Sequence, residues 1–260
     1  FLTSYTPYQP EISQGILQAI FEYQSLICEL VGMDVANSSL YDWATACGEA
    51  GLMSGRITRR DKILVPDLMS PIRLSVLRTY TEPLGMKVEL IEHVEKTGQL
   101  EIEDLKDRID DDTAMVYIEN PSYMGFAEEN AEAIGEVAHD NKAMFVVGVD
   151  PMSLGILKAP GEYGADIVCG EGQPLGIHMS YGGPLLGILA CRHENKYIRQ
   201  MPGRIIGITQ EEASDRQAFT MTLQTREQHI RREKATSNIC TNQALCAVAA
   251  GVYLSLMGPK

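Results

Sequence analysis

The sequence predicts an α/β fold in which helices cover both faces of a mainly parallel sheet. Segments with helical spacing of apolar residues alternate along the chain with short apolar segments that lack polar alternation. This pattern is typical of parallel strands buried on both faces. Polar residues directly follow several of these strands, at the edge of such a sheet where ligand sites form. With 260 residues and 45% hydrophobic content, the chain is long enough for one large domain.

Each predicted helix has apolar residues at intervals of three or four positions. The predicted helices are 11–31, 39–55, 70–84, 101–109, 128–139 and about 227–257. Pro10 precedes the first helix, and Ser39 and Asp42 are spaced as a capping box at the start of the second. The predicted strands are 62–65, 87–91, 114–118, 144–149, 165–169 and 185–190. A loop-rich region, 201–215, precedes the last helix.

Composition argues against several classes of function. A net charge of −13 disfavours a nucleic-acid partner, and no apolar segment approaches the roughly 20 residues that a membrane helix needs. Six cysteines without a C-x-x-C pair predict buried, reduced thiols and a cytoplasmic location. The five histidines have no paired ligand spacing, so we expect no metal site. Because the chain starts at Phe1 and stops straight after a helical pattern, we expect it to be a fragment.

The segment 143–192 has the layout of a pyridoxal-phosphate cradle with one residue missing. Strand 144–149 ends on Asp150, and strand 165–169 leads into the glycine-rich stretch 170–176. Enzymes that use this cofactor hold its pyridinium nitrogen with an acid and form a Schiff base with a lysine. Here no lysine occurs between Lys158 and Lys196. An alternative interpretation of Asp150 is a strand-end turn residue before Pro151.

Two other segments have alternative interpretations. The glycines of 170–176 resemble a dinucleotide-binding fingerprint, but the spacing has one residue too many and Pro174 disfavours the receiving helix. A nucleotide site there is the weaker interpretation. The first ten residues form an arm with three aromatics and two prolines. It either staples one helix to its neighbour or carries tyrosine hydroxyls and an amide into a shared cleft.

Five long motifs closely resemble the glycine cleavage system P-protein family, specifically its N-terminal half, which many prokaryotes make as a separate subunit. The motifs are TPYQPEISQG at 6–15, DVANSSLYD at 34–42, YIENP at 117–121, GEGQPLG at 170–176 and LQTREQHIRREKATSNIC at 223–240. The resemblance covers nearly the whole chain. Trp43 is a departure, because the family usually has glycine there.

The resemblance implies a PLP-dependent transferase-like large domain of the aspartate aminotransferase class (fold type I). This domain spans 1–260 with the arm at 1–10, and the resemblance places a further N-terminal segment and a C-terminal small domain outside the chain. Laid over the lysine-bearing half of the family, the lysine falls on Pro174 and the acid that pairs with the ring nitrogen on Asp150. The phosphate-binding helix start falls on 41–45, where Asp42 would repel a phosphate. Asp150 and Asp42 would then be vestigial, and this chain itself is expected to bind no cofactor.

The implied function is that of one subunit of glycine decarboxylase. A lysine-bearing subunit 2 would hold pyridoxal phosphate, decarboxylate glycine and pass the aminomethyl group to the lipoyl arm of H-protein, releasing CO2, and this chain alone would be inactive. Tyr5, Thr6, Tyr8 and Gln9 are expected to border the partner's site. The basic cluster Arg226, Arg231, Arg232 and Lys234 would contact the carrier or the substrate carboxylate, or form an ordinary surface salt-bridge set. The alternative function is a non-enzymatic scaffold or regulatory protein.

Overall fold

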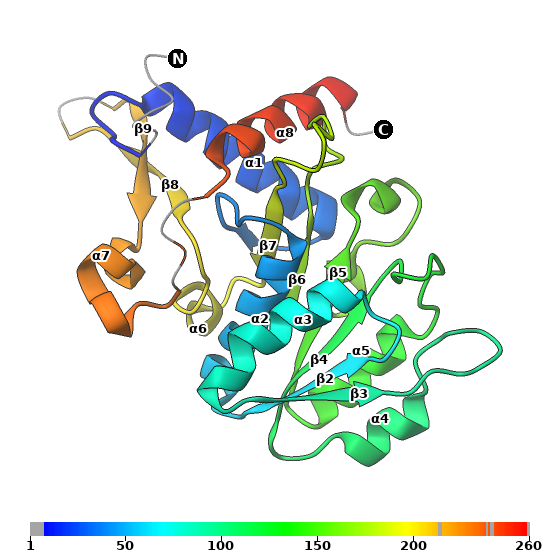
Figure 1. Cartoon of the computed structure of the whole chain (residues 1–260). Helices are drawn as coiled ribbons and strands as arrows, with labels where there is room; N and C mark the ends of the chain where they lie inside the picture. The colour runs from blue at the N-terminus through cyan, green and yellow to red at the C-terminus, as the bar shows by residue number, and fades with distance from the viewer. Residues whose placement is uncertain (1–7, 213–214, 238, 240–241, 259–260) are drawn as a thin grey trace.

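A seven-stranded sheet forms the centre of the molecule, which is described here from a computed structural model (Figure 1). The structure describes residues 8–212, 215–237, 239 and 242–258. The strands are β1 (Val35–Ala36), β2 (Lys62–Pro66), β3 (Lys87–Ile91), β4 (Thr113–Glu119), β5 (Met144–Val149), β6 (Ile167–Glu171) and β7 (Gly187–Cys191). Their order is β1-β7-β6-β5-β4-β2-β3. Strands β2 to β6 are parallel, whereas β7 is antiparallel to both β6 and β1. The predicted mainly parallel sheet is confirmed.

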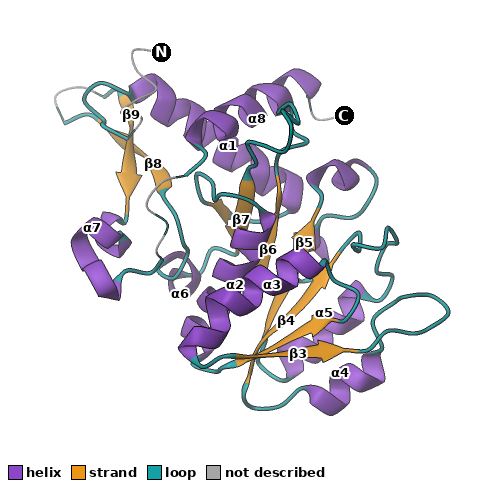
Figure 2. Cartoon of the chain, in the orientation of Figure 1, coloured by secondary structure: helices purple, strands orange, loops and turns teal. Residues whose placement is uncertain are grey.

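Helices lie on both faces of this sheet (Figure 2). The α-helices are α1 (Gln14–Val31), α2 (Trp43–Thr58), α3 (Pro71–Thr81), α4 (Ile102–Arg108), α5 (Ala131–Asp140), α6 (Asn195–Ile198), α7 (Gln228–Arg231) and α8 (Ala244–Met257). Short 3-10 turns are η1 (Glu82–Leu84), η2 (Pro151–Gly155), η3 (Pro160–Tyr163), η4 (Gln224–Arg226) and η5 (Arg232–Lys234). A separate hairpin consists of β8 (Ile205–Gln210) and β9 (Gln217–Thr222).

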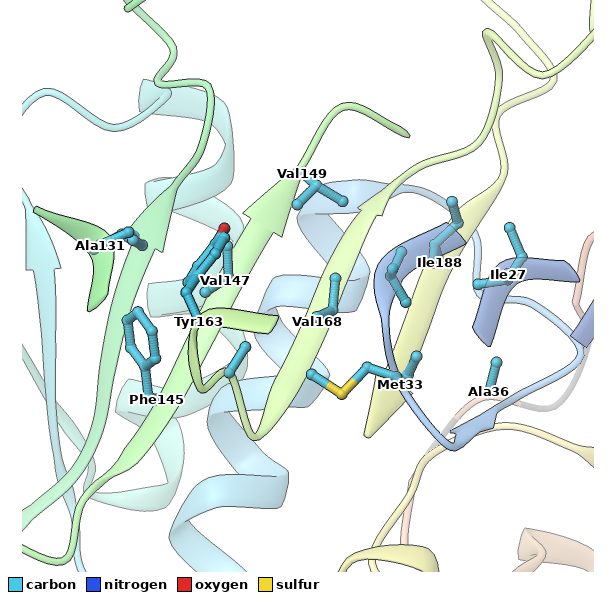
Figure 3. Packing of buried hydrophobic residues seen from close by; sticks show 14 of the residues in the cluster. Ile27, Met33, Ala36, Ala131, Phe145, Val147, Val149, Tyr163, Val168 and Ile188 are labelled. Carbon is cyan, nitrogen blue, oxygen red and sulfur yellow. The ribbon is translucent and has the colours of Figure 1, made fainter. Parts of the chain in front are cut away.

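Alternate residues of each strand enter two different cores, because successive side chains of a strand point to opposite faces. In β5, Met144 and Val146 pack with α2 and α3. Phe145 and Val147 belong to the core on the opposite face, which also includes residues of α1, α5 and α8. Figure 3 shows both side chains beside Ala131 of α5 and Tyr163. Every residue of β4 and β5 is buried, which explains why these strands have no polar alternation in the sequence.

Two predictions near the C-terminal end of the chain were wrong. The expected helix 227–257 is broken, since α7 and η5 are short and α8 begins only at Ala244. Polar residues in the break bond to distant parts of the chain: Ser237 donates to Glu49, and the backbone of Gln243 donates to Ser39. The expected loop 201–215 contains β8, whose pairing partner β9 lies entirely beyond that range.

The second helix starts four residues later than predicted. Asp42 is its N-cap, and its side chain accepts a hydrogen bond from the backbone of Thr45 at 2.7 Å. Ser39 takes no part in a capping box, because its hydroxyl accepts the bond from Gln243. The rest of the helix buries small residues against the sheet, which allows a close approach.

The predicted thiols agree with the structure where it describes them. Cys28, Cys47, Cys169, Cys191 and Cys246 are free, and Cys240 lies outside the described residues. Burial raises the pKa of Cys28 and of Cys191 to about 12, which suppresses thiolate formation at each site. Among the described helices none has the length and apolar character needed to cross a membrane.

Candidate functional site

The carboxyl edge of β4, β5 and β6 is the candidate site, because these parallel strands lie side by side and each ends in an acidic residue. Glu119 ends β4, Asp150 directly follows β5, and Glu171 ends β6. Helix α2 starts at the same edge, where the backbone N–H of Trp43 contacts Glu171. A helix start beside strand ends is an arrangement that can bind an anion and a ring.

Two carboxylates bind the N–H groups at the start of α2. Asp42 accepts from Thr45, and Glu171 Oε2 accepts from the Trp43 backbone at 3.2 Å. The other oxygen of Glu171 accepts from the backbone of Leu186 at 2.8 Å and of Gln173 at 3.0 Å. Burial raises the pKa of Glu171, although these three donors lower it in part. The backbone N–H groups of Trp43 and Thr45 at the start of α2 are therefore already bonded to carboxyl groups of this chain, which disfavours an added anion there.

The indole of Trp43 lies directly on the sheet next to this helix start. A Cβ added at Gly148 of β5 would approach the ring to 2.9 Å, so the absence of a side chain at Gly148 makes room for it. The indole Nε1 donates to the hydroxyl of Tyr117 at 3.1 Å. On the ring face, the Arg73 guanidinium carbon lies 3.8 Å from the centroid. In place of the small residue expected at position 43, the chain thus has an indole ring that contacts Gly148, Tyr117 and Arg73.

Arg73 is fixed in place by Glu119. Its Nε and Nη2 donate to the two carboxylate oxygens, both at 2.6 Å, in a bidentate pair. The ring of Tyr123 lies on another side of the guanidinium, 5.7 Å away. The hydroxyl of Tyr117 donates to Glu119 at 3.3 Å. Burial acts to lower the pKa of Arg73, but hydrogen bonding and charge attraction to Glu119 outweigh it, so the pKa of Arg73 is raised.

Asp150 and Pro174 lie where the sequence predicted, after neighbouring strands. Asp150 is the N-cap of η2, and its side chain accepts from the backbone of Met152 at 3.0 Å. This bond is the strand-end turn that the alternative interpretation of Asp150 described. Pro174 lies in a tight turn after β6, in which the Leu175 N–H donates to the carbonyl of Gly172 at 3.0 Å.

The described part of the arm supports the stapling interpretation. The Tyr8 hydroxyl donates to Asn242 at 2.5 Å, and Asn242 donates to Ser38 at 2.8 Å. The Arg204 guanidinium carbon is 4.1 Å from the Tyr8 ring centroid, and burial raises the pKa of Tyr8. Gln9 is exposed. Tyr5 and Thr6 lie outside the described residues.

The basic cluster does not form one surface. Arg226 is only 8% exposed and donates to the backbone carbonyls of Met201 and Gly203. Burial lowers its pKa, although the neighbouring Glu227 opposes this effect. Arg231 is exposed in α7. Arg226 therefore links η4 to the loop before β8 in the interior of the molecule. Arg231 remains a candidate for contact with a carrier.

Sequence reasoning named the residues that follow strands and missed those that depend on tertiary pairing. Asp42, Asp150 and Pro174 could be placed from neighbouring strands and helices. Arg73 had no local signal, and Glu171 appeared in the sequence only as a member of the glycine-rich stretch 170–176. In the part of the chain that the structure describes, there is no group of three or more side chains that could hold a metal ion.

The whole chain, residues 1–260, matches the family model described as glycine cleavage system P-protein. The chain belongs to this family. It is 60% identical over 259 residues to a probable glycine dehydrogenase (decarboxylating) subunit 1 of Staphylothermus marinus, covering 99% of this chain and 55% of that protein. It is 59% identical to the protein of the same description from Thermococcus onnurineus, covering 100% of this chain and 58% of that one. This chain therefore spans little more than half the length of these relatives.

Solved structures agree with the family and the fold. A crystal structure of glycine decarboxylase (P-protein) of the glycine cleavage system, in inhibitor-bound form, matches with a TM-score of 0.92 and 44% identity, covering 100% of this chain and 57% of that one. A cysteine desulfurase from Thermococcus onnurineus matches with a TM-score of 0.59 and 22% identity, covering 95% of this chain and 59% of that one, and shows the fold alone. The predicted fold-type-I class is confirmed.

Proposed function

We propose that this P-protein chain is part of subunit 1 of a glycine decarboxylase and that a homologous, lysine-bearing subunit 2 supplies the cofactor site. The observation that carries this proposal is the carboxyl edge of β5 and β6, where carboxylates bind the α2 start and Pro174 follows β6. The family match and the name "subunit 1" of the relatives support it.

The described residues of this edge do not fit pyridoxal phosphate. No lysine occurs between Lys158 and Lys196 to form the imine, and Asp42 and Glu171 oppose a phosphate dianion. Asp150 would be a vestige of the acid that pairs with the ring nitrogen. In this proposal no step of the reaction takes place on this chain. When bound by the partner, the cofactor supplies an electron sink for the carbanion left by decarboxylation.

In this proposal the chain forms one wall of the partner's site. Tyr5, Thr6, Tyr8 and Gln9 border that site, and Arg231 contacts the acidic carrier or the substrate carboxylate. The contacts of Tyr8 with Asn242 and of Asn242 with Ser38 would hold the arm in position. The complete assembly would decarboxylate glycine and transfer the aminomethyl group to the lipoyl arm of H-protein, with release of CO2.

Reconstitution tests the proposal. The protein is mixed with its lysine-bearing partner, pyridoxal phosphate and lipoylated carrier, and exchange of labelled bicarbonate into glycine is measured. We expect exchange only in the complete mixture, since neither subunit would form the site alone. Activity of this protein without the partner would contradict the assignment. Failure to bind the partner in a pull-down would favour the scaffold alternative.

A further inference from the structure

The 260-residue chain has a single tryptophan, Trp43. Trp43 is the first residue of α2, at the carboxyl edge of the sheet. Its indole rests against Gly148, two residues before Asp150. The ring therefore lies between the start of α2 and the end of β5, which are the two elements that would hold the phosphate and the ring nitrogen of a cofactor in this fold.

The indole is held by neighbours on several sides. Tyr117 accepts from its Nε1, and Arg73 lies on its face at 3.8 Å. Arg73 is held in place because its Nε and Nη2 both donate to Glu119, whose side chain is 2% exposed. A cation on the face of tryptophan is a favourable electrostatic contact, stronger where water is excluded. These contacts fix one position of the ring.

We propose that the side chain of Trp43 permanently fills the place where the ring of a cofactor would lie between α2 and β5. The carboxyl group of Glu171 fills the place where the phosphate of that cofactor would bind. The two side chains close the cradle independently. Trp43 fills the space that a flat ring would use, and Glu171 binds the backbone N–H groups of Trp43, Gln173 and Leu186. The proposal does not depend on the reaction of glycine. It means that two side chains exclude the cofactor from this site, in addition to the lack of a lysine.

Removal of each side chain should open a different half of the cradle. Trp43→Gly leaves a cavity walled by Tyr117, Gly148 and Arg73, which suits a flat aromatic ring as small as indole or 3-hydroxypyridine. Glu171→Gln keeps an acceptor for the backbone donors but removes the negative charge that opposes an anion. Only the combination both empties the ring space and removes the Glu171 charge, while Asp42, the other carboxylate at the start of α2, stays in place in every variant.

Binding of defined probes by the whole protein tests this. Isothermal titration with indole and equilibrium dialysis with pyridoxal phosphate are carried out on the wild-type protein, Trp43→Gly, Trp43→Gly/Glu171→Gln and the matched control Trp43→Phe, which keeps a ring. We expect saturable indole binding by both variants that carry Trp43→Gly and none by the wild type or Trp43→Phe. Pyridoxal phosphate should bind the double variant at least ~10-fold more tightly than the single one.

The wild-type protein provides a second test that needs no variant to fold. Because Trp43 is the only tryptophan, its fluorescence reports this position alone. We expect weak quenching by acrylamide and no saturable change on addition of pyridoxal phosphate or 3-hydroxypyridine. Saturable quenching by either probe would overturn the proposal. So would a folded Trp43→Gly protein that fails to bind indole, or equal binding of pyridoxal phosphate by the wild type and the double variant.

Discussion

Three acidic residues at neighbouring strand ends have different partners, and those partners determine what each can do. Glu119 is paired with Arg73, Asp150 caps a turn, and Glu171 binds backbone N–H groups. Each is already used by the fold. Glu119 and Glu171 each accept three hydrogen bonds from this chain, so they are poorly available to a ligand, because releasing them leaves part-buried donors unsatisfied.

The pair of Glu119 and Arg73 should be important for stability. Glu119→Gln removes the charge that compensates a guanidinium whose side chain is 15% exposed, so we expect a loss of about 2 kcal/mol in unfolding free energy. Glu103→Gln is the matched control, because its ion pair with Lys106 is exposed and should contribute below about 0.5 kcal/mol. Denaturant unfolding measures both, and equal losses would contradict the interpretation.

His139 should make stability depend on pH. Its hydrogen bond to Asp166 raises its pKa above the unfolded value of about 6.5. The folded state then binds the proton more tightly, so this contribution is fully present below pH about 6.5 and is lost as pH rises through the folded pKa. Unfolding at pH 6 and pH 8 should show a smaller pH difference for His139→Gln than for wild type.

Pro174→Lys alone should not restore cofactor binding. The new amine would lie after β6, but Glu171 would still bind the N–H of Trp43 and the indole would still lie on Gly148. We expect no visible absorbance band of a lysine-bound cofactor after addition of pyridoxal phosphate. Appearance of such a band, with the adduct confirmed by borohydride reduction and mass spectrometry, would show that the lysine alone was limiting.

At the scale of elements, α2 connects the sheet to the site. The N-cap of this helix should contribute to the stability of the fold. Asp42→Ala removes the acceptor for the Thr45 N–H and should cost about 1 kcal/mol in unfolding free energy. Asp42→Asn keeps an acceptor oxygen and should cost much less, since asparagine is an equally good cap. Equal destabilisation by both substitutions in thermal unfolding would mean that the charge, and not the cap, is what matters.

The broken C-terminal helix illustrates what local pattern cannot predict. Residues 227–257 have a spacing compatible with one helix, but Ser237, Asn242 and Gln243 bond to residues near positions 38–49. Such bonds compensate for the lost helical hydrogen bonds only in the folded context. The pattern predicted α8 itself, whose apolar face packs on α1.

At the scale of the whole molecule, the strands at the centre of the sheet were the predictable part. β4 to β7 are short, largely apolar runs because both of their faces are covered. The sequence located these four strands, and it also located β2 and the edge strand β3, although β3 contains the polar residues Lys87 and Glu89. β1 is only two residues long and exists because β7 lies beside it, so no local run identifies it. The same applies to the site. Asp42 and Asp150 follow from element ends, whereas the contact of Arg73 with Trp43 depends on packing between α2 and α3.

The antiparallel pairing of β1 with β7 has a consequence for the order of folding. Val35 pairs with Cys191, so the edge of the sheet joins segments that are 156 residues apart in the sequence (191 − 35). Loop-closure entropy delays such contacts until the parallel strands between them have formed. In native-state hydrogen exchange, the amides of Asp34 and Asn37, which donate to β7, should open at a lower free energy than those of Val146 and Val147. During synthesis, β1, the first strand in the described part of the chain, would be the last to join this sheet.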